Sequence, residues 1–231
     1  MNDLKKLLQN WRGRKVLMVV FPHPDDETMA TGGLLLVAHH FGWKTIVISL
    51  TKGDAGRLHI NPKGKSIGEL RVQELSGAAK ILKVSKLIIE DFGDGKLKGK
   101  RVKVESYLKQ AVKTYRPGIL VTYDHSGLTG HPDHIALSVA VKEVISKLPD
   151  KPTLLWVTLP KTWHNIWHPR VAQYVTKPTH VLDLGHFVFG KYLAAKSHRS
   201  QVFTKPFLPL ILLLLLRRKE WYHKVAEYEN L

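Results

Sequence analysis

The residues best suited to chemistry form the segment His23-Pro24-Asp25-Asp26-Glu27, which follows the apolar run Val16–Val20 and the pair Phe21-Pro22. This segment brings one imidazole and three carboxylates together within five positions. Adjacent carboxylates repel one another and are costly to bury without a partner. Because a bound cation removes that repulsion, the segment indicates a metal site rather than a packing element.

A second cluster has the same character. Gly130-His131-Pro132-Asp133-His134 follows another apolar run, Ile119–Val121. Either cluster alone would fit a polar turn with solvated charges equally well. Two His/Asp clusters that each follow an apolar run indicate one metal site with ligands drawn from both segments.

Composition limits the classes of protein and of metal site. The chain has 231 residues, enough for one large α/β domain, and 44% of them are hydrophobic. The formal net charge of +17 attracts anions such as acidic lipid headgroups or a phosphorylated or carboxylated substrate. Lys and Arg are dispersed without interleaved aromatic residues, so we do not expect a nucleic-acid partner. The chain has no Cys, so a zinc site must use His and carboxylate ligands.

Apolar runs alternate with helical patterns along the chain. The runs that predict strands are Lys15–Phe21, Thr45–Leu50, Leu87–Glu90, Ile119–Tyr123, Leu154–Leu159 and His180–Leu184. The segments that predict helices are Thr28–His40, Ser66–Leu82, Val102–Tyr115 and His134–Leu148. The alternation predicts an α/β fold, a Rossmann-like and mostly parallel sheet with helices on both faces.

Two details of the helices and loops support this fold. Ser66-x-x-Glu69 fits a capping box at a helix start. The expected apolar side of the last predicted helix contains Ile135, Val139, Ile145 and Leu148. Polar segments follow each of the first four predicted strands. Because ligands bind at the carboxyl ends of the strands in open α/β sheets, we expect the functional site at that edge.

We expect a catalytic domain over residues 1–203 and an apolar and basic C-terminal extension over 204–231 that packs on the same domain. The extension contains the apolar run Phe207–Leu216 and then Arg217-Arg218-Lys219. The run is too short to span a bilayer, which needs about 20 residues. It is therefore either a buried helix that completes the core or an interfacial anchor with a basic flank on anionic headgroups. The apolar stretch before His23 is also too short for a signal peptide or a span, so we expect a cytoplasmic protein, with peripheral membrane binding left open.

The two clusters can supply a complete hydrolytic zinc site. Zinc in such a site takes about three His or carboxylate ligands and keeps a position open for water. His23, Asp26 and His134 can be those ligands, and zinc lowers the pKa of its bound water to about 7. Asp25 is the candidate general base, and His131, as an imidazolium, is the candidate donor to the developing oxyanion. Spacing alone also allows the reverse, with His131 as the ligand and His134 as a supporting neighbour.

These motifs resemble the PIG-L/LmbE family of zinc-dependent de-N-acetylases, which carries His-Pro-Asp-Asp-Glu after its first strand and Gly-His-Pro-Asp-His after a later one. Further similarity lies in the loop Thr51–Gly56, in Arg71-x-x-Glu74-Leu75, in Phe92-x-Asp94-Gly95, and in the segment from Lys191 through His198-x-x-Gln201. The resemblance covers residues 15–201 of the chain, and its two metal motifs are highly specific.

The resemblance implies a reaction and roles for the residues of both clusters. It implies that His23, Asp26 and His134 bind Zn²⁺, that Asp25 is the general base, and that His131 stabilises the tetrahedral intermediate. The implied reaction removes an acetyl group from an N-acetylglucosamine-type sugar conjugate and releases acetate and a free amine. An N-acetylated sugar conjugate is therefore the expected partner, together with an anionic membrane surface as a further candidate; an oligomer is compatible with the sequence.

Residues outside the two clusters receive less direct roles. The resemblance implies that Arg71 and Asp94 contact the sugar of the substrate. Some family members have Tyr two residues before the His that corresponds to His131, and this chain has Thr129 there. We therefore expect no phenol contact to the substrate carbonyl from this loop. We interpret Glu27 as an acceptor of backbone donors rather than as a catalytic group.

Two other functions stay open at this point. One is metal-dependent hydrolysis of another amide or an ester at the same site. The other is binding of a sugar or lipid without catalysis. Asp25 argues against the second, because a binding protein needs no base beside a metal.

Overall fold

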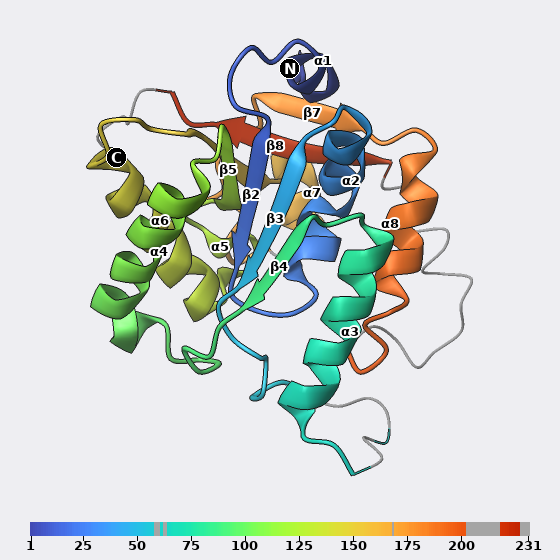
Figure 1. The fold of residues 1–231 in the computed structure, drawn as a ribbon, viewed down its shortest axis with the longest axis vertical. Coiled ribbons are helices and arrows are strands. Elements are labelled where there is room, and N and C mark those ends of the chain that lie inside the picture. Colours follow the sequence, from blue (N-terminus) through green and yellow to red (C-terminus); the bar gives the residue numbers. More distant parts are fainter. Residues whose placement is uncertain (58–60, 62–63, 168, 202–217, 227–231) are drawn as a thin grey trace.

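The computed structural model describes residues 1–57, 61, 64–167, 169–201 and 218–226. These residues form one eight-stranded sheet with the order β1-β7-β8-β6-β5-β2-β3-β4 (Figure 1). All neighbouring strands are parallel except β8, which is antiparallel to both β6 and β7. The strands are β1 (Asn2–Asp3), β2 (Val16–Phe21), β3 (Lys44–Ser49), β4 (Lys86–Ile89), β5 (Ile119–Tyr123), β6 (Thr153–Thr158), β7 (His180–Asp183) and β8 (Lys219–Lys224).

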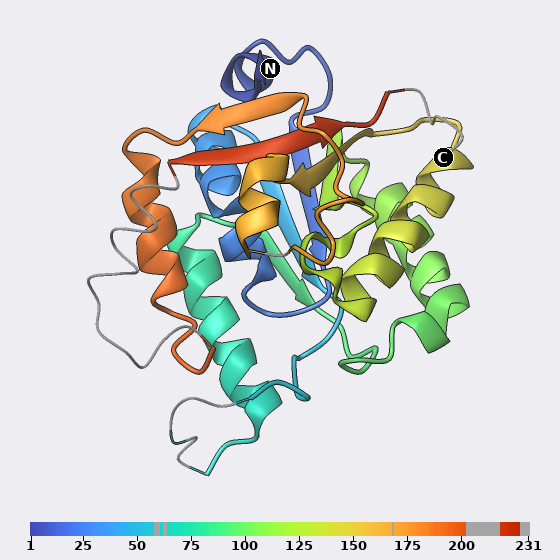
Figure 2. The same ribbon diagram turned by 180° about the vertical axis from the view of Figure 1, so that it is seen from behind.

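Helices cover both faces of the sheet. They are α1 (Leu4–Gln9), α2 (Asp26–His40), α3 (Ile67–Ile81), the short 3₁₀ turn η1 (Lys98–Lys100), α4 (Arg101–Tyr115), α5 (Gly127–Gly130), α6 (Pro132–Ser146), α7 (Lys161–Trp167) and α8 (Phe187–Ala195). Helices α2, α3 and α8 contribute to the core on one face, and α4 and α6 to the core on the other. Figures 1 and 2 show these two layers from opposite sides. The predicted Rossmann-like class is therefore confirmed.

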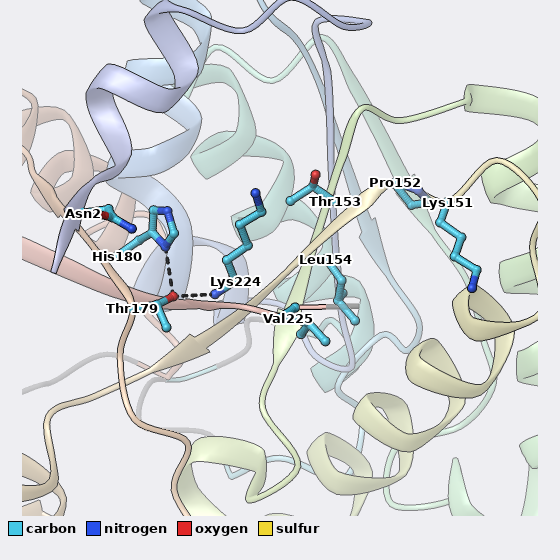
Figure 3. A pocket seen from close by; sticks show the side chains of 10 residues that line it. Asn2, Lys151, Pro152, Thr153, Leu154, Thr179, His180, Lys224 and Val225 are labelled. Carbon is cyan, nitrogen blue, oxygen red and sulfur yellow. Dashed lines mark hydrogen bonds between the residues drawn. The ribbon is translucent and has the colours of Figure 1, made fainter. Parts of the chain in front are cut away.

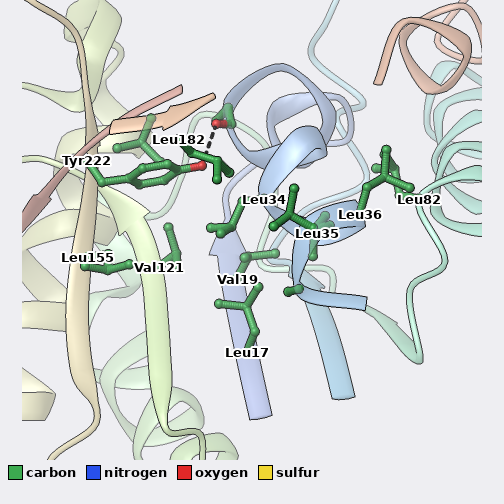
Figure 4. Packing of buried hydrophobic residues seen from close by; sticks show 14 of the residues in the cluster. Leu17, Val19, Leu34, Leu35, Leu36, Leu82, Val121, Leu155, Leu182 and Tyr222 are labelled. Atoms are coloured by element: carbon green, nitrogen blue, oxygen red, sulfur yellow. Dashed lines mark hydrogen bonds between the residues drawn. The ribbon is translucent and has the colours of Figure 1, made fainter. Parts of the chain in front are cut away.

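The central strand β2 shows why an uninterrupted apolar run is needed here. Leu17 and Val19 point into the core beneath α2, whereas Met18 and Val20 point into the core beneath α4 and α6. Because successive side chains of a strand alternate between faces, both cores require an apolar residue at every position. Figure 4 shows Leu17 and Val19 near Leu34 of α2.

The predicted elements correspond to β2–β7, α2, α3, α4 and α6, and their ends agree within two residues. The capping box of α3 is present, because Ser66 accepts from the Glu69 N–H and Glu69 accepts from the Ser66 N–H. The predicted apolar side of this helix is only partly correct. Ile145 is fully buried and Leu148 packs against the core, but Ile135 and Val139 are 36% and 40% exposed. In the first turns of α6 the buried face contains His134, Leu137 and Val141 instead, about one position away from the predicted stripe.

The C-terminal strand β8 was not predicted, and it lies inside the sheet between β6 and β7 (Figure 2). It belongs to the segment 204–231 that we expected to be an extension of the catalytic domain. Phe207–Leu216 and Arg217 lie outside the described residues. In the part of the chain that the structure describes, we find no helix with the length and apolar character needed to cross a membrane.

Strand β8 is tied to the middle of α2 by a buried carboxylate. Glu220 is 5% exposed and accepts from the backbone N–H groups of Gly33 and Leu34, both at 2.9 Å. The Lys191 ammonium and the Tyr222 hydroxyl each donate to it at 2.7 Å. Four donors thus satisfy both carboxylate oxygens, as a buried charge requires. Tyr222 also reaches the Ala30 carbonyl across the same core (Figure 4).

We predict that Glu220→Gln lowers the free energy of unfolding by about 3 kcal/mol, because it leaves the Lys191 charge buried without its partner. Urea denaturation measures this change. The matched control is Asp183→Asn, which neutralises a carboxylate that is 55% exposed and pairs with Arg218 at 3.5 Å. The control should change stability by less than about 0.5 kcal/mol. Similar small changes in both variants would contradict a structural role for the buried pair.

Candidate active site

Segments from three strand ends meet at one point of the sheet edge. His23 follows β2, Asp94 follows β4, and Asp133 and His134 follow β5. The His23 ring contacts all three of the others, at 3.0 Å to Asp94, 3.3 Å to Asp133 and 3.3 Å to His134. The parallel order β5-β2-β3-β4 brings these carboxyl ends together, as the sequence predicts.

His23, Asp26 and His134 form a compact triangle of possible ligand atoms. His23 Nδ1 lies 3.3 Å from His134 Nε2 and 3.5 Å from Asp26 Oδ2. His134 Nε2 lies 3.5 Å from Asp26 Oδ1. Ligand atoms about 2.0–2.1 Å from a tetrahedral zinc ion are about 3.3–3.4 Å from one another. The measured separations are close to that value, although Asp26 faces each histidine with a different oxygen, so the three nearly buried side chains converge on one candidate metal position.

The opposite nitrogen of His23 faces two carboxylates. Nε2 lies 3.0 Å from Asp94 Oδ1 and 3.3 Å from Asp133 Oδ2. Asp133 also accepts from the N–H groups of Gly95 at 2.7 Å and Leu97 at 3.1 Å, so this carboxylate is already engaged by the backbone. A carboxylate that accepts the N–H of one imidazole nitrogen leaves the other nitrogen free to bind a metal. Asp94 and Asp133 thus orient His23 toward the triangle.

These carboxylates draw positive charge to His23. Burial alone lowers the pKa of His23, but its hydrogen bonds to Asp133, Asp26 and Asp94 outweigh burial and raise that pKa to about 11. A bound metal cation would balance the negative charge of the same carboxylates. Among the described residues, two sets of side chains have candidate ligand atoms within 4.8 Å of one another: His23, His131 and His134, and His23, Asp94 and Asp133. Asp26 is in neither set, but it lies 3.5 Å from His23 Nδ1 through Oδ2 and 3.5 Å from His134 Nε2 through Oδ1.

Tyr123 supports two corners of the triangle and was missed in the sequence analysis. Its hydroxyl donates to Asp26 Oδ1 at 2.8 Å, and its ring stacks on His134 with centroids 4.3 Å apart. His134 is held on its far side, where Nδ1 lies 3.0 Å from the Gly127 carbonyl. A signal for Tyr123 existed, because a Tyr that ends a buried strand needs a partner for its hydroxyl.

Asp25 sits beside the triangle in an unusual backbone conformation, with φ of 104°. Its side chain is 24% exposed and lies 3.4 Å from Arg71 Nη2. Burial raises the pKa of Asp25, repulsion from Asp26 adds to the increase, and Arg71 opposes it, so the pKa is about 7. A carboxyl group with that pKa can accept and return a proton near neutral pH.

His131 caps α6 with its ring. Its Nδ1 accepts from the Asp133 N–H at 3.2 Å, and its side chain is exposed beside the His23 ring. Burial of part of the ring, followed by the nearby His23 and His134, lowers the pKa of His131. An accepting Nδ1 leaves the proton of the neutral ring on Nε2. The structure therefore favours a neutral Nε2–H donor over the imidazolium that we expected.

Arg71 and Asp94, the predicted sugar contacts, lie against protein partners. Arg71 is 4% exposed and donates to the carbonyls of Gly53 at 2.9 Å and Pro24 at 2.6 Å. The side chain of Asp94 is 8% exposed and accepts from the Ala55 N–H at 3.0 Å as well as facing His23. Both residues hold loops of the site in place, and a contact to substrate stays a prediction for each.

A cavity of about 620 Å³ lies away from this site, where β6 and β7 begin and β8 ends (Figure 3). His180, Thr179 and Lys224 line it, and the Thr179 hydroxyl accepts the Lys224 N–H at 2.8 Å. No residue of the two His/Asp clusters lines this cavity. Among the described residues, the candidate metal ligands lie instead at the carboxyl ends of the parallel strands.

The fold and site define a class of protein: an α/β protein with a candidate His/Asp metal-binding group and a further carboxylate, Asp25, at the carboxyl edge of a mostly parallel sheet. The sequence model of the PIG-L family, described as GlcNAc-PI de-N-acetylase, matches residues 18–145, which is more than half of the chain. The chain belongs to the PIG-L family.

Named relatives extend this similarity beyond the matched region. The chain is 30% identical over 206 residues to diacetylchitobiose deacetylase of Thermococcus kodakarensis, covering 87% of this chain and 71% of that protein. It is 28% identical over 227 residues to a 1D-myo-inositol 2-acetamido-2-deoxy-α-D-glucopyranoside deacetylase of Saccharopolyspora erythraea, covering 80% and 83%. The fold is similar to N,N'-diacetylchitobiose deacetylase of Pyrococcus horikoshii, with a TM-score of 0.73, 20% identity, and coverage of 96% of this chain and 91% of that one.

We predict that His23→Ala, Asp26→Ala and His134→Ala each lose most of the bound metal, because each removes one corner of the triangle. Asp25→Asn should retain it. Metal content of the purified variants, measured by inductively coupled plasma mass spectrometry, checks this expectation. Equal metal content in all four variants would reject the triangle as the ligand set.

We also predict that Tyr123→Phe weakens zinc affinity about 10-fold or more, since it removes the hydroxyl that orients Asp26 but keeps the stacked ring. Competition with a chromogenic chelator measures this affinity. Tyr115→Phe is the matched control, because Tyr115 lies at the end of α4 beside Lys86. An affinity equal to that of the control would show that Tyr123 has no influence on the metal.

Proposed function

We propose that the chain is a zinc-dependent hydrolase that removes the acetyl group from an N-acetylglucosamine-type sugar conjugate and releases acetate and a free amine. The observation that supports this proposal most strongly is the grouping of His23, Asp26 and His134, with Asp25 and His131 next to them. Family membership supports this function, and so do the related deacetylases, whose names specify N-acetylated sugars.

The proposed ligands are His23, Asp26 and His134, and not His131. His131 uses Nδ1 to cap α6 and is exposed, whereas His134 is 6% exposed and fixed between Gly127 and the Tyr123 ring. When bound, zinc supplies a polarised carbonyl and an acidified water molecule. The donor set of two imidazoles and one carboxylate suits this ion.

The remaining chemistry belongs to the side chains. Asp25 accepts a proton from the attacking water as the C–O bond forms, and His131 Nε2–H donates to the carbonyl oxygen as negative charge develops there. Asp25 then gives its proton to the departing nitrogen as the C–N bond breaks. One water is consumed, and acetate and the amine leave.

We further propose that the protein works in the cytoplasm and binds anionic membrane surfaces reversibly. The net charge of +17, the exposed Arg218 and Lys219, and the apolar run Phe207–Leu216 in the sequence support this proposal. Basic residues near an anionic membrane contribute about 1 kcal/mol each, and salt screens the effect.

The function is tested by acetate release from a panel of N-acetylated sugars, with N-acetylated amino acids and acetate esters as controls. Asp25→Asn should lower kcat by about 10² or more with little change in KM, as loss of a general base does. His131→Ala should lower kcat similarly, through loss of the oxyanion donor. Near-normal turnover by Asp25→Asn would reject the mechanism, and preference for the control substrates would reject the sugar.

Membrane binding is tested by sedimentation with liposomes. We expect binding to vesicles of phosphatidylserine and phosphatidylcholine at low salt, release as salt rises, and much weaker binding to phosphatidylcholine alone. Failure to sediment with anionic vesicles at any salt concentration would remove the membrane proposal and leave deacetylation untouched.

A further inference from the structure

The backbone of Asp25 is held away from the conformation that this residue would normally take. Asp25 is the N-cap of α2, yet its φ of 104° and ψ of −30° lie outside the extended region usual for a cap, and its side chain makes no capping hydrogen bond. A non-glycine residue with such a φ is strained and persists only where its surroundings enforce it. The carboxylate is therefore not bound to the helix end; it lies 3.4 Å from Arg71 Nη2 and close enough to Asp26 for the two charges to interact.

Two buried side chains hold the peptide groups on either side of this residue. Arg71 Nη2 donates to the Pro24 carbonyl at 2.6 Å, which fixes the peptide that enters Asp25. The N–H of Asp25 donates to Glu27 Oε2 at 3.0 Å. Glu27 is 2% exposed. Its hydrogen bond from the Asp25 N–H agrees with our expectation that Glu27 accepts backbone donors. These contacts determine the rotation of the peptide and therefore the direction of the Asp25 carboxylate.

Glu27 is itself fixed by a residue that is distant in the sequence. Its other oxygen, Oε1, lies 3.0 Å from His198 Nε2 and also accepts from the Thr28 hydroxyl. His198 is fully buried and follows α8. The hydrogen bonds of Glu27 to Thr28 and His198 prevent its carboxylate from turning away from the Asp25 N–H.

The segment that carries His198 is anchored independently. Two residues further on, Ser200 donates to Glu74 of α3 through its N–H at 2.8 Å and its hydroxyl at 2.6 Å. Helix α8 packs along α2 and α3. His198 is therefore presented to Glu27 by a rigid support, and the contact is not an accident of a surface side chain.

We propose that Glu27 and His198 are positioning residues that hold Asp25 in the strained conformation required of a general base. This inference rests on the proposed role of Asp25. Without the Glu27 acceptor, Asp25 relaxes toward an extended backbone and its carboxylate turns to cap the first N–H groups of α2, as Asp commonly does. The ligand triangle is built from other atoms and stays intact.

The test compares variants of Glu27 and His198 in the native protein and in an Asp25→Asn background. We expect Glu27→Ala and His198→Leu to lower kcat for acetate release by about 10- to 100-fold, because small displacements of a catalytic group have effects of that size. KM and bound zinc should change less than about 2-fold. His198→Gln, which keeps a donor toward Glu27, should restore part of the lost kcat. In an Asp25→Asn background, the same substitutions should lower the residual kcat less than about 2-fold, since they act through Asp25.

The matched control is His180→Leu. His180 is also a buried histidine with a hydrogen-bond partner, Thr179, but it lies at the start of β7, away from the site. It should lower the urea midpoint as His198→Leu does and leave kcat unchanged. If Glu27→Ala fails to fold, His198→Leu and His198→Gln carry the comparison alone.

Several results would overturn the proposal. One is normal turnover in Glu27→Ala or His198→Leu. Another is an equal fall in kcat with and without Asp25, and a third is a fall explained entirely by lost zinc. If Asp25→Asn itself turns over normally, the proposed general base is rejected, and the positioning role is rejected with it. A large loss in Asp25→Asn with additive losses in the other variants rejects the positioning role alone.

Discussion

The structure depends on one electrostatic constraint: carboxylates from the first turns of α2 and α6 and from the loop after β4 meet around a single imidazole. Asp26, Asp94 and Asp133 all lie within 3.5 Å of the His23 ring. Backbone and side-chain donors satisfy part of this charge, including the Tyr123 hydroxyl on Asp26 and two N–H groups on Asp133. The carboxylate charge that these donors leave unbalanced favours a cation beside His23 Nδ1. Zinc fits both this charge and the ligand separations, and its presence would make the crowding of carboxylates stabilising rather than repulsive.

Part of the backbone strain lies beside this group of carboxylates. Of the four described non-glycine residues with positive φ, Asp25 (104°) lies in the first His/Asp cluster and Leu128 (60°) lies two residues before the second. The other two, Lys83 and Arg116, follow α3 and α4 away from the site. The strained turn around Leu128 brings the Gly127 carbonyl to His134, and the one at Asp25 frees its carboxylate from capping. Such strain requires a rigid frame, which the central sheet and the buried Glu220 contacts to α2 provide.

Much of the fold and the metal cluster could be predicted, because the signals are local. Strand β2 is an uninterrupted apolar run and β5 begins with one, and a His/Asp cluster follows each strand before or at the start of the next long helix. Strand β8 was missed because Lys219–Lys224 is short, charged at both ends, and buried by partners that sequence does not reveal. Tyr123 and His198 were assigned no firm role because their contacts join residues 97 and 171 positions apart. Short sequence motifs are enough to predict the candidate ligands. The residues that orient those ligands are identified only from the contacts of the folded chain.

The central claim is that two imidazoles and one carboxylate hold the metal. X-ray absorption spectroscopy at the zinc edge of the purified holoprotein tests this claim most directly, because multiple scattering counts imidazole ligands. We predict two imidazoles with nitrogen and oxygen ligands at about 2.0–2.1 Å, and an unchanged imidazole count in His131→Ala. Three imidazoles in the native protein, falling to two in His131→Ala, would contradict the assignment and place His131 among the ligands.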